Sequence, residues 1–420
     1  MNHLTRRRFM HGLGATLGAT LGARLIRPHL LANPHISRDM TSRRFLFVHA
    51  EGGWDPLCVF APQFDDHTIQ MEPDAEPITL GGLKLVDAPN RDAVTSFFRD
   101  HAHRSVILNG VSTRSVNHET CQAVALTGST SHDRADWGTR IAAAHAQSNT
   151  LPHLALSGPV LSGDLGVFVS RGDGALQPLL DGYLLEDAHP YTEPLSPSTT
   201  ALIQAHLSIR GRDLNASAHA PQLVQQVQES QRRAHTLWRQ RDTINFEAEE
   251  GLVGQAQIAI NAFAKGVSHC ATISAEGDWD THGDNTLQTS LFNRLFSDLS
   301  QIMRLLNETQ GPDGESLSND TILVVMSEMG RTPAYNFTGG RDHWPFTSFL
   351  LVGDDLNGGQ VVGGYREGFT GVGVDPYSLT LNPERAGISA EEVGATLLTL
   401  GGVDAQRMLP HVTPLYGVLS

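Results

Sequence analysis

Short apolar runs alternate with segments of helical periodicity along most of the chain. The apolar runs end in glycine or polar residues, as buried strands do, and lie at 45–48, 105–108, 270–273, 321–326 and 349–352. The helical patterns cover about 119–127, 136–146, 218–246, 252–266, 287–308 and 389–401. This alternation predicts an α/β fold: a three-layer sandwich with a mainly parallel central sheet and helices on both faces.

The domain organisation follows from where this pattern breaks. Residues 158–217 are rich in Gly, Ser, Pro and Asp and lead into a polar, Gln-rich stretch from Gln222 to Arg241. We therefore expect a single α/β domain over residues 43–415, with an insertion or cap at about 158–250 that carries no chemistry of its own.

The N-terminal segment differs in composition from the rest. Thr5-Arg6-Arg7-Arg8-Phe9 precedes a short Gly/Ala-rich run, which is the pattern of a twin-arginine export signal over residues 1–32. The chain is thus predicted to meet the twin-arginine export machinery and to function in the periplasm or otherwise outside the cytoplasm. An N-terminal anchor or a chance basic stretch is the alternative. No later segment has 18 uncharged apolar residues, so the mature chain is not expected to insert stably into a membrane.

Charge and composition narrow the chemistry. The net charge of −15 argues against a nucleic-acid binder or an anionic-membrane binder. Lys84 and Lys265 are the only lysines, so arginine, histidine, carboxylates or bound metal must carry any charge chemistry. The three cysteines form no CxxC pair, which excludes a Cys-rich zinc site.

Candidate chemistry gathers where strands end, the edge at which parallel sheets bind ligands. Asp280 and His282 are two positions apart, so an extended backbone would point both at one divalent ion; a helix-capping cluster is the alternative. Glu328 directly follows the strand at 321–326 and needs a cation there, either Arg331 or a metal.

Three further segments add candidates. Gly339-Gly340-Arg341-Asp342-His343-Trp344-Pro345 is a constrained turn whose charged residues could face a shared ligand. Asp55, after Gly52-Gly53-Trp54, can ligate a metal or cap the next turn of the chain. His118 opens a predicted helix, where free N–H groups favour an anion. GxSxG, GxxxxGK[ST], HExxH and a GxGxxG after a strand are all absent, which disfavours the enzyme classes that these motifs mark.

Taken in order, these motifs resemble the twin-arginine-exported "domain of unknown function 1501" family within the alkaline phosphatase/sulfatase superfamily. The likeness covers most of residues 43–415 and rests on the arginine signal, GGWD, WDTHGDN, SEMGRTP and GGRDHWP. It implies an alkaline phosphatase-like fold with a two-metal site for phosphate or sulfate esters. The metal ligands that it implies are Asp55, Asp280, His282, Glu328 and His343.

Two positions depart from the superfamily pattern. His118 stands where the nucleophile is expected, and Met329 replaces the histidine of an Asp-His pair. Met329 is a poor ligand for Mg²⁺ or Ca²⁺, so one metal, or none, must be considered in place of two. His118 could form a phosphohistidine, act as a general base or ligate a metal.

Two functions remain open from the sequence. The first is an exported hydrolase of small anionic phosphate or sulfate esters that depends on a divalent metal, Zn, Mn, Mg or Ca. In it, His118 is the catalytic residue and Arg331 or Arg341 neutralises the ester oxygens. The second is a non-catalytic exported binding or assembly protein that keeps the fold. An oxidoreductase accessory factor has only the export signal in its favour.

Overall fold

A computed structural model describes residues 43–172, 202, 205, 221–240, 244 and 250–420. The predicted export signal lies outside these residues, and so does much of the predicted insertion. Within the described part of the chain, no helix has both the length and the apolar character needed to cross a membrane.

An eleven-stranded sheet forms the centre of the molecule, in the order β14-β13-β12-β4-β11-β8-β1-β7-β5-β6, with β15 beside β4. The strands are β1 (Arg44–His49), β4 (Ser105–Ser112), β5 (His153–Ala155), β6 (Val169–Arg171), β7 (Cys270–Ser274), β8 (Thr321–Met326), β11 (Phe346–Val352), β12 (Gln360–Arg366), β13 (Thr370–Val374), β14 (Leu381–Ala386) and β15 (Ile388–Ser389). Two small antiparallel pairs lie apart: β2 (Glu76–Leu80) with β3 (Leu83–Asp87), and β9 (Gly330–Arg331) with β10 (His343–Trp344).

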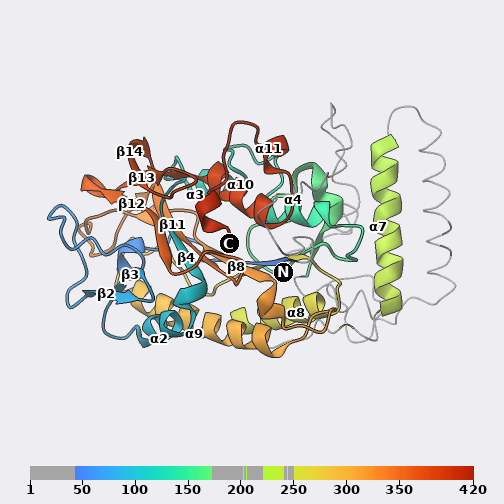
Figure 1. The fold of residues 1–420 in the computed structure, drawn as a ribbon, viewed down its shortest axis with the longest axis horizontal. Helices are drawn as coiled ribbons and strands as arrows, with labels where there is room; N and C mark the ends of the chain where they lie inside the picture. Colours follow the sequence, from blue (N-terminus) through green and yellow to red (C-terminus); the bar gives the residue numbers. More distant parts are fainter. Residues whose placement is uncertain (1–42, 173–201, 203–204, 206–220, 241–243, 245–249) are drawn as a thin grey trace, which may run out of the picture.

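Helices cover both faces of the sheet, as Figure 1 shows. One face holds α2 (Asp92–His101), α8 (Leu252–Ala264) and α9 (Leu287–Glu308). The other holds α3 (His118–Thr127), α4 (Trp137–Ala144) and α10 (Ala390–Leu400), followed by the short α11 (Ala405–Met408). The long α7 (Pro221–Gln240) lies at the end of the molecule, near the 3-10 helix Gly163–Phe168.

Alternation along β1 explains the two cores. Leu46 and Val48 point into one hydrophobic cluster, and Phe45 and Phe47 point into the other. Each of these side chains is at most 3% exposed. Burying a side chain of this size stabilises the fold by about 1.5–3 kcal/mol, so a central strand that is apolar on both sides holds the layers together.

The predicted α/β class with a mainly parallel sheet is confirmed. β1 pairs in parallel with β7 and β8, so the carboxyl ends of these three strands meet at one edge. β11 is antiparallel to both β4 and β8, a direction that its uniformly apolar run does not encode. The pattern also missed α2, whose buried side chains pack largely on α9.

Candidate metal centre

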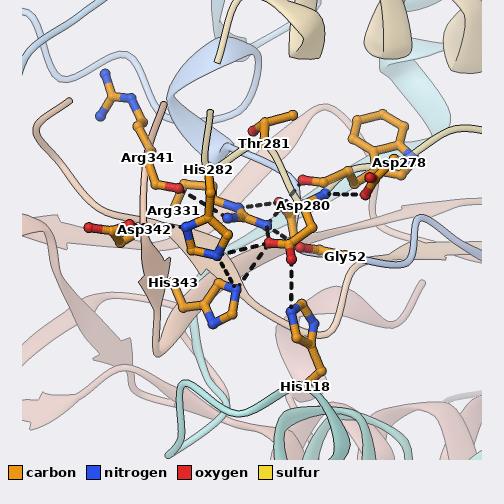
Figure 2. A network of polar contacts seen from close by, with 12 residues as sticks. Gly52, His118, Asp278, Asp280, Thr281, His282, Arg331, Arg341, Asp342 and His343 are labelled. Atoms are coloured by element: carbon orange, nitrogen blue, oxygen red, sulfur yellow. Dashed lines mark hydrogen bonds and ion pairs between the residues drawn. The ribbon is translucent and has the colours of Figure 1, made fainter. Parts of the chain in front are cut away.

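Segments from four places in the sequence meet at the carboxyl edge of the sheet (Figure 2). His118 is the first residue of α3, which follows β4. Asp280 and His282 lie in the loop after β7, Arg331 ends β9 just after β8, and His343 begins β10. The pairing of His343 with Arg331 in the β9–β10 ladder fixes the last two side by side.

Local chemistry holds these segments at close range. Asn117 caps α3 by accepting a hydrogen bond from the Thr120 N–H, which sets His118 at the start of the helix. Gly52 has a φ of 118°, and a Cβ there would lie 2.7 Å from the Asp280 nitrogen. A Cβ on Gly340 would lie 2.0 Å from the His282 carbonyl oxygen. Both positions need glycine, because a side chain there would push the loop that carries Asp280 and His282 away from its neighbours.

Each of the three histidines is anchored through its Nδ1 atom. His118 Nδ1 lies 2.8 Å from Glu328 Oε1, His282 Nδ1 lies 3.0 Å from Asp342 Oδ1, and His343 Nδ1 lies 2.7 Å from the Val116 carbonyl oxygen. Carboxylate and carbonyl oxygens only accept hydrogen bonds, so each Nδ1 carries the proton. In the neutral rings, the Nε2 atoms therefore bear lone pairs.

Those lone pairs converge on Asp280. His282 Nε2 lies 3.1 Å and His343 Nε2 3.0 Å from Asp280 Oδ1, and the two Nε2 atoms lie 2.8 Å apart. His118 Nε2 lies 3.5 Å from the other oxygen, Oδ2. Among the described residues, His118, Asp280 and His343 form a group whose ligand atoms all lie within 4.8 Å of one another. Acceptors this close repel unless a cation, either a proton or a metal ion, lies between them.

The donor set fits a divalent metal. Atoms that bind a tetrahedral ion at about 2.0–2.1 Å lie about 3.3 Å from one another, close to the separations seen here. Metal-binding histidines also donate their second N–H to a carboxylate or a backbone carbonyl, as all three do. Imidazole nitrogens suit Zn²⁺, whereas Ca²⁺, Mg²⁺ and Mn²⁺ prefer oxygen ligands.

The charges around Asp280 and His118 are linked. Burial, the largest single influence, would raise the pKa of Asp280. The hydrogen bond and charge of Arg331, together with the contacts of His343 and His282, outweigh burial and bring the pKa to about 2. The hydrogen bond to Glu328 raises the pKa of His118, against partial burial, which lowers it. Asp280 is therefore an ionised carboxylate at neutral pH, ready to bind a cation.

Glu328 has a different partner from either of the two expected. It is 7% exposed, and its Oε1 accepts hydrogen bonds from the Gly52 N–H at 2.9 Å and from His118. Neither Arg331 nor the histidine Nε2 group contacts it among the bonds that the structure describes. Glu328 thus orients His118 from behind, and the sequence could not show this because the two lie 210 positions apart.

Asp55 and Arg341 lie together, apart from the converging Nε2 atoms. Asp55 Oδ2 is 3.1 Å from Arg341 Nε and accepts a hydrogen bond from Asn285 at 2.8 Å. Its other oxygen accepts from the Leu57 N–H at 3.0 Å and caps the 3-10 helix Pro56–Cys58. Of the two roles the sequence left open for Asp55, the structure shows the cap.

The two arginines are buried and contact protein oxygens. Arg331 and Arg341 are both 0% exposed. Arg331 donates to the Gly53 carbonyl at 2.7 Å and to Asp280 at 2.6 Å, while Arg341 donates to the Thr332 carbonyl at 2.6 Å. Both guanidinium groups are thus committed largely to protein oxygens, and their expected role of neutralising ester oxygens stays a prediction.

Comparison with known proteins gives one family and distant structural neighbours. Residues 42–413 match the family described as "Protein of unknown function (DUF1501)", and curated proteins give no match. A putative sulfatase from Bacteroides thetaiotaomicron VPI-5482 is 11% identical, with 86% of this chain and 71% of that chain covered and a TM-score of 0.36. A 2-O GAG sulfatase is also 11% identical, with 86% and 71% covered and a TM-score of 0.34.

Proposed function

We propose that this chain, which belongs to the DUF1501 family of proteins of unknown function, is a divalent-metal-dependent hydrolase of phosphate or sulfate esters. The observation that carries the proposal is the convergence of three Nε2 atoms on one ionised carboxylate, at the edge of the sheet where α/β proteins bind ligands. Each histidine has its tautomer fixed by a separate acceptor, so the arrangement is preorganised for a cation.

Asp280, His282 and His343 would hold the ion. Their ligand atoms lie 2.8–3.1 Å apart, on the Oδ1 side of the carboxylate. An ion bound there would supply a Lewis acid for an ester oxygen and would attract the anionic substrate. Asp342 and the Val116 carbonyl keep the two rings in the ligating orientation from outside.

His118 would move the proton. Its Nε2 atom lies beside Oδ2 of Asp280, and its Nδ1–H donates to Glu328. Nε2 is therefore the atom that would accept a proton from the attacking water. The Nε2 atom could then return that proton to the leaving oxygen. This division leaves the base on one side of Asp280 and the ion on the other.

The proposed place of action is outside the cytoplasm. The pair Arg6-Arg7, followed by Arg8-Phe9 and a Gly/Ala-rich run, supports export by the twin-arginine machinery. Replacing Arg6 and Arg7 by lysine should leave the chain in the cytoplasm. Equal periplasmic amounts of both forms in cell fractionation would contradict this route.

The central experiment joins metal analysis to turnover of chromogenic phosphate and sulfate esters. The purified protein should contain Zn after growth with a mixture of Zn, Mn, Mg and Ca. It should also lose turnover on chelation and regain it when metal is restored. Absence of both metal and turnover would overturn the proposal.

Variants then separate the two roles. His343→Ala should lose metal and turnover together, whereas His118→Ala should keep metal and lose turnover by about 10²–10⁴-fold. Asp284→Asn is a matched control from the same loop, because Asp284 bonds only Thr286 among the described contacts. Metal loss in His118→Ala would make His118 a ligand and not a base.

A non-catalytic binding protein is the second candidate, and the burial of Arg331 and Arg341 favours it. A hydrolase of anionic esters commonly presents a cationic side chain to its substrate, and both predicted arginines are committed inside the protein. Protein with a full metal content and no turnover of any ester would support this candidate.

A further inference from the structure

We propose that the centre binds a single metal ion and that the guanidinium groups of Arg341 and Arg331 take the place of a second ion. The inference rests on the proposed metal site, but it is carried by different contacts. The resemblance seen in the sequence implies two ions, whereas the structure gives two of the implied ligand carboxylates, Asp55 and Glu328, partners within the protein.

Asp55 already has its cation. The side chains of Asp55 and Arg341 are each 1% exposed and form an ion pair at 3.1 Å. A carboxylate this deeply buried requires a positive partner, and Arg341 is always charged. With Asn285 on one oxygen and the Leu57 N–H on the other, protein groups already contact both oxygens of this carboxylate, and Arg341 balances its charge.

Arg341 is itself held in place. Its guanidinium donates to the Thr332 and Gln70 carbonyl groups and stacks over the Tyr335 ring, 4.2 Å from the ring centre. Cation–π contact and buried carbonyl acceptors both favour a fixed guanidinium. Displacing it to admit an ion at Asp55 would leave a buried charge without partners.

Arg331 lies beside Asp280 as Arg341 lies beside Asp55. It donates to Asp280 Oδ1 at 2.6 Å, to the Gly53 and Trp279 carbonyl groups at 2.7 and 3.1 Å, and to the Gly52 carbonyl. These backbone oxygens surround the guanidinium as they would surround a metal ion. Asp280 thus already shares one oxygen with a permanent cation, and the histidines complete the surroundings of one ion only.

Glu328 also has protein partners. Its Oε1 accepts from the Gly52 N–H and from His118 Nδ1, and its Oε2 lies 3.3 Å from the Ser327 hydroxyl. Of the five expected ligands, Asp55 and Glu328 are therefore occupied by protein groups. Asp280, His282 and His343 remain.

The first test is the metal content of the native protein, measured by plasma mass spectrometry after saturation with Zn²⁺ and removal of free metal. We expect about one ion per chain. Two tightly bound ions would overturn the inference and leave the proposed function standing. No bound ion would overturn both.

Manganese gives a readout independent of counting. Protein loaded with Mn²⁺ should show the six-line resonance of an isolated ion in electron paramagnetic resonance at every loading ratio. A spin-coupled pair appearing above one equivalent would place a second ion within a few ångströms and would overturn the inference.

Variants test the assignment of Asp55. Asp55→Asn should keep about one ion per chain, whereas Asp280→Asn should bind much less. Since Asp55→Asn leaves Arg341 buried without its partner, the double change Asp55→Leu/Arg341→Met provides a folded alternative, because apolar replacement of a buried pair is often neutral. Loss of the metal from a folded double variant would make Asp55 a ligand and contradict the inference.

Discussion

The two edges of the central sheet use the same residue types in different arrangements. At the amino edge, arginines pair singly with acids: Arg43 with Asp355 at 2.7 Å, and Arg104 with Asp354 at 2.9 Å. At the carboxyl edge, one acid, Asp280, is shared by three histidines and an arginine.

Histidines show the same contrast. At the amino edge, the rings of His145 and His269 stack with centres 4.1 Å apart, and His145 Nε2 lies 2.8 Å from the Gly401 carbonyl. At the carboxyl edge, His282 and His343 share Asp280 and each has a second acceptor behind it. Histidines whose Nδ1 atoms have protein acceptors and whose Nε2 atoms converge on one carboxylate indicate a cation site. Single arginine–aspartate pairs indicate a structural contact.

The largest expected effect is on stability at the amino edge. Asp355→Asn leaves Arg43, which is 3% exposed, with the Leu400 carbonyl but no negative partner. Removing one partner of a buried pair costs about 3–5 kcal/mol, so the free energy of unfolding in urea should fall by that amount. Metal content should stay unchanged in the folded protein; a joint loss would mean that the two edges are not independent.

At the carboxyl edge, Asp280→Ala should act on metal binding. Mutating a residue that only hydrogen-bonds to a metal ligand typically weakens metal affinity by about 10–100-fold. Removing the shared carboxylate, a proposed ligand itself, should weaken it by more than about 100-fold. Competition with a chromophoric chelator measures the change. Unaltered affinity would show that the histidines bind no ion at Asp280.

Acid should destabilise both edges through buried neutral histidines. Burial lowers the pKa of His49 to about 4 and also lowers the pKa values of His153 and His269. The unfolded chain binds these protons below about pH 6.5 and the folded chain does not, so stability is lost as the pH falls from about 6.5 towards 4. His49 alone accounts for about 3 kcal/mol at the lower limit.

Urea unfolding at a series of pH values checks this, with His49→Gln as the comparison. The variant should lose less stability than the parent between pH 6.5 and 4. The carboxylate of Asp280, with its pKa of about 2, stays ionised throughout this range and does not confuse the result. Identical pH dependence in both proteins would show that His49 does not contribute to the loss of stability in acid.

The smallest effect is expected for Glu328→Gln. The amide oxygen can still accept from His118 Nδ1 and from the Gly52 N–H, but the negative charge behind the imidazole is lost. Turnover should fall by about 10–100-fold while the metal content remains. A loss as large as that of His118→Ala would show that Glu328 does more than orient the ring.

The sequence by itself determined the fold class and the location of the chemistry. The residues of β1 and β8 form apolar runs, which predict parallel strands buried on both faces. The polar residues at the carboxyl ends of these strands predict the edge where a site forms. Asp280 and His282 are near neighbours in the chain, and a local pattern was enough to bring them into one hypothesis.

Only the tertiary structure decided which charges belong together. Asp55 with Arg341, Glu328 with His118, and Arg331 with Asp280 are all pairs separated by long stretches of sequence. Local pattern cannot choose between a metal and an arginine as the partner of a buried carboxylate, because either satisfies its charge. The choice depends on which segment the folded chain brings within about 3 Å, and that distance is set by packing.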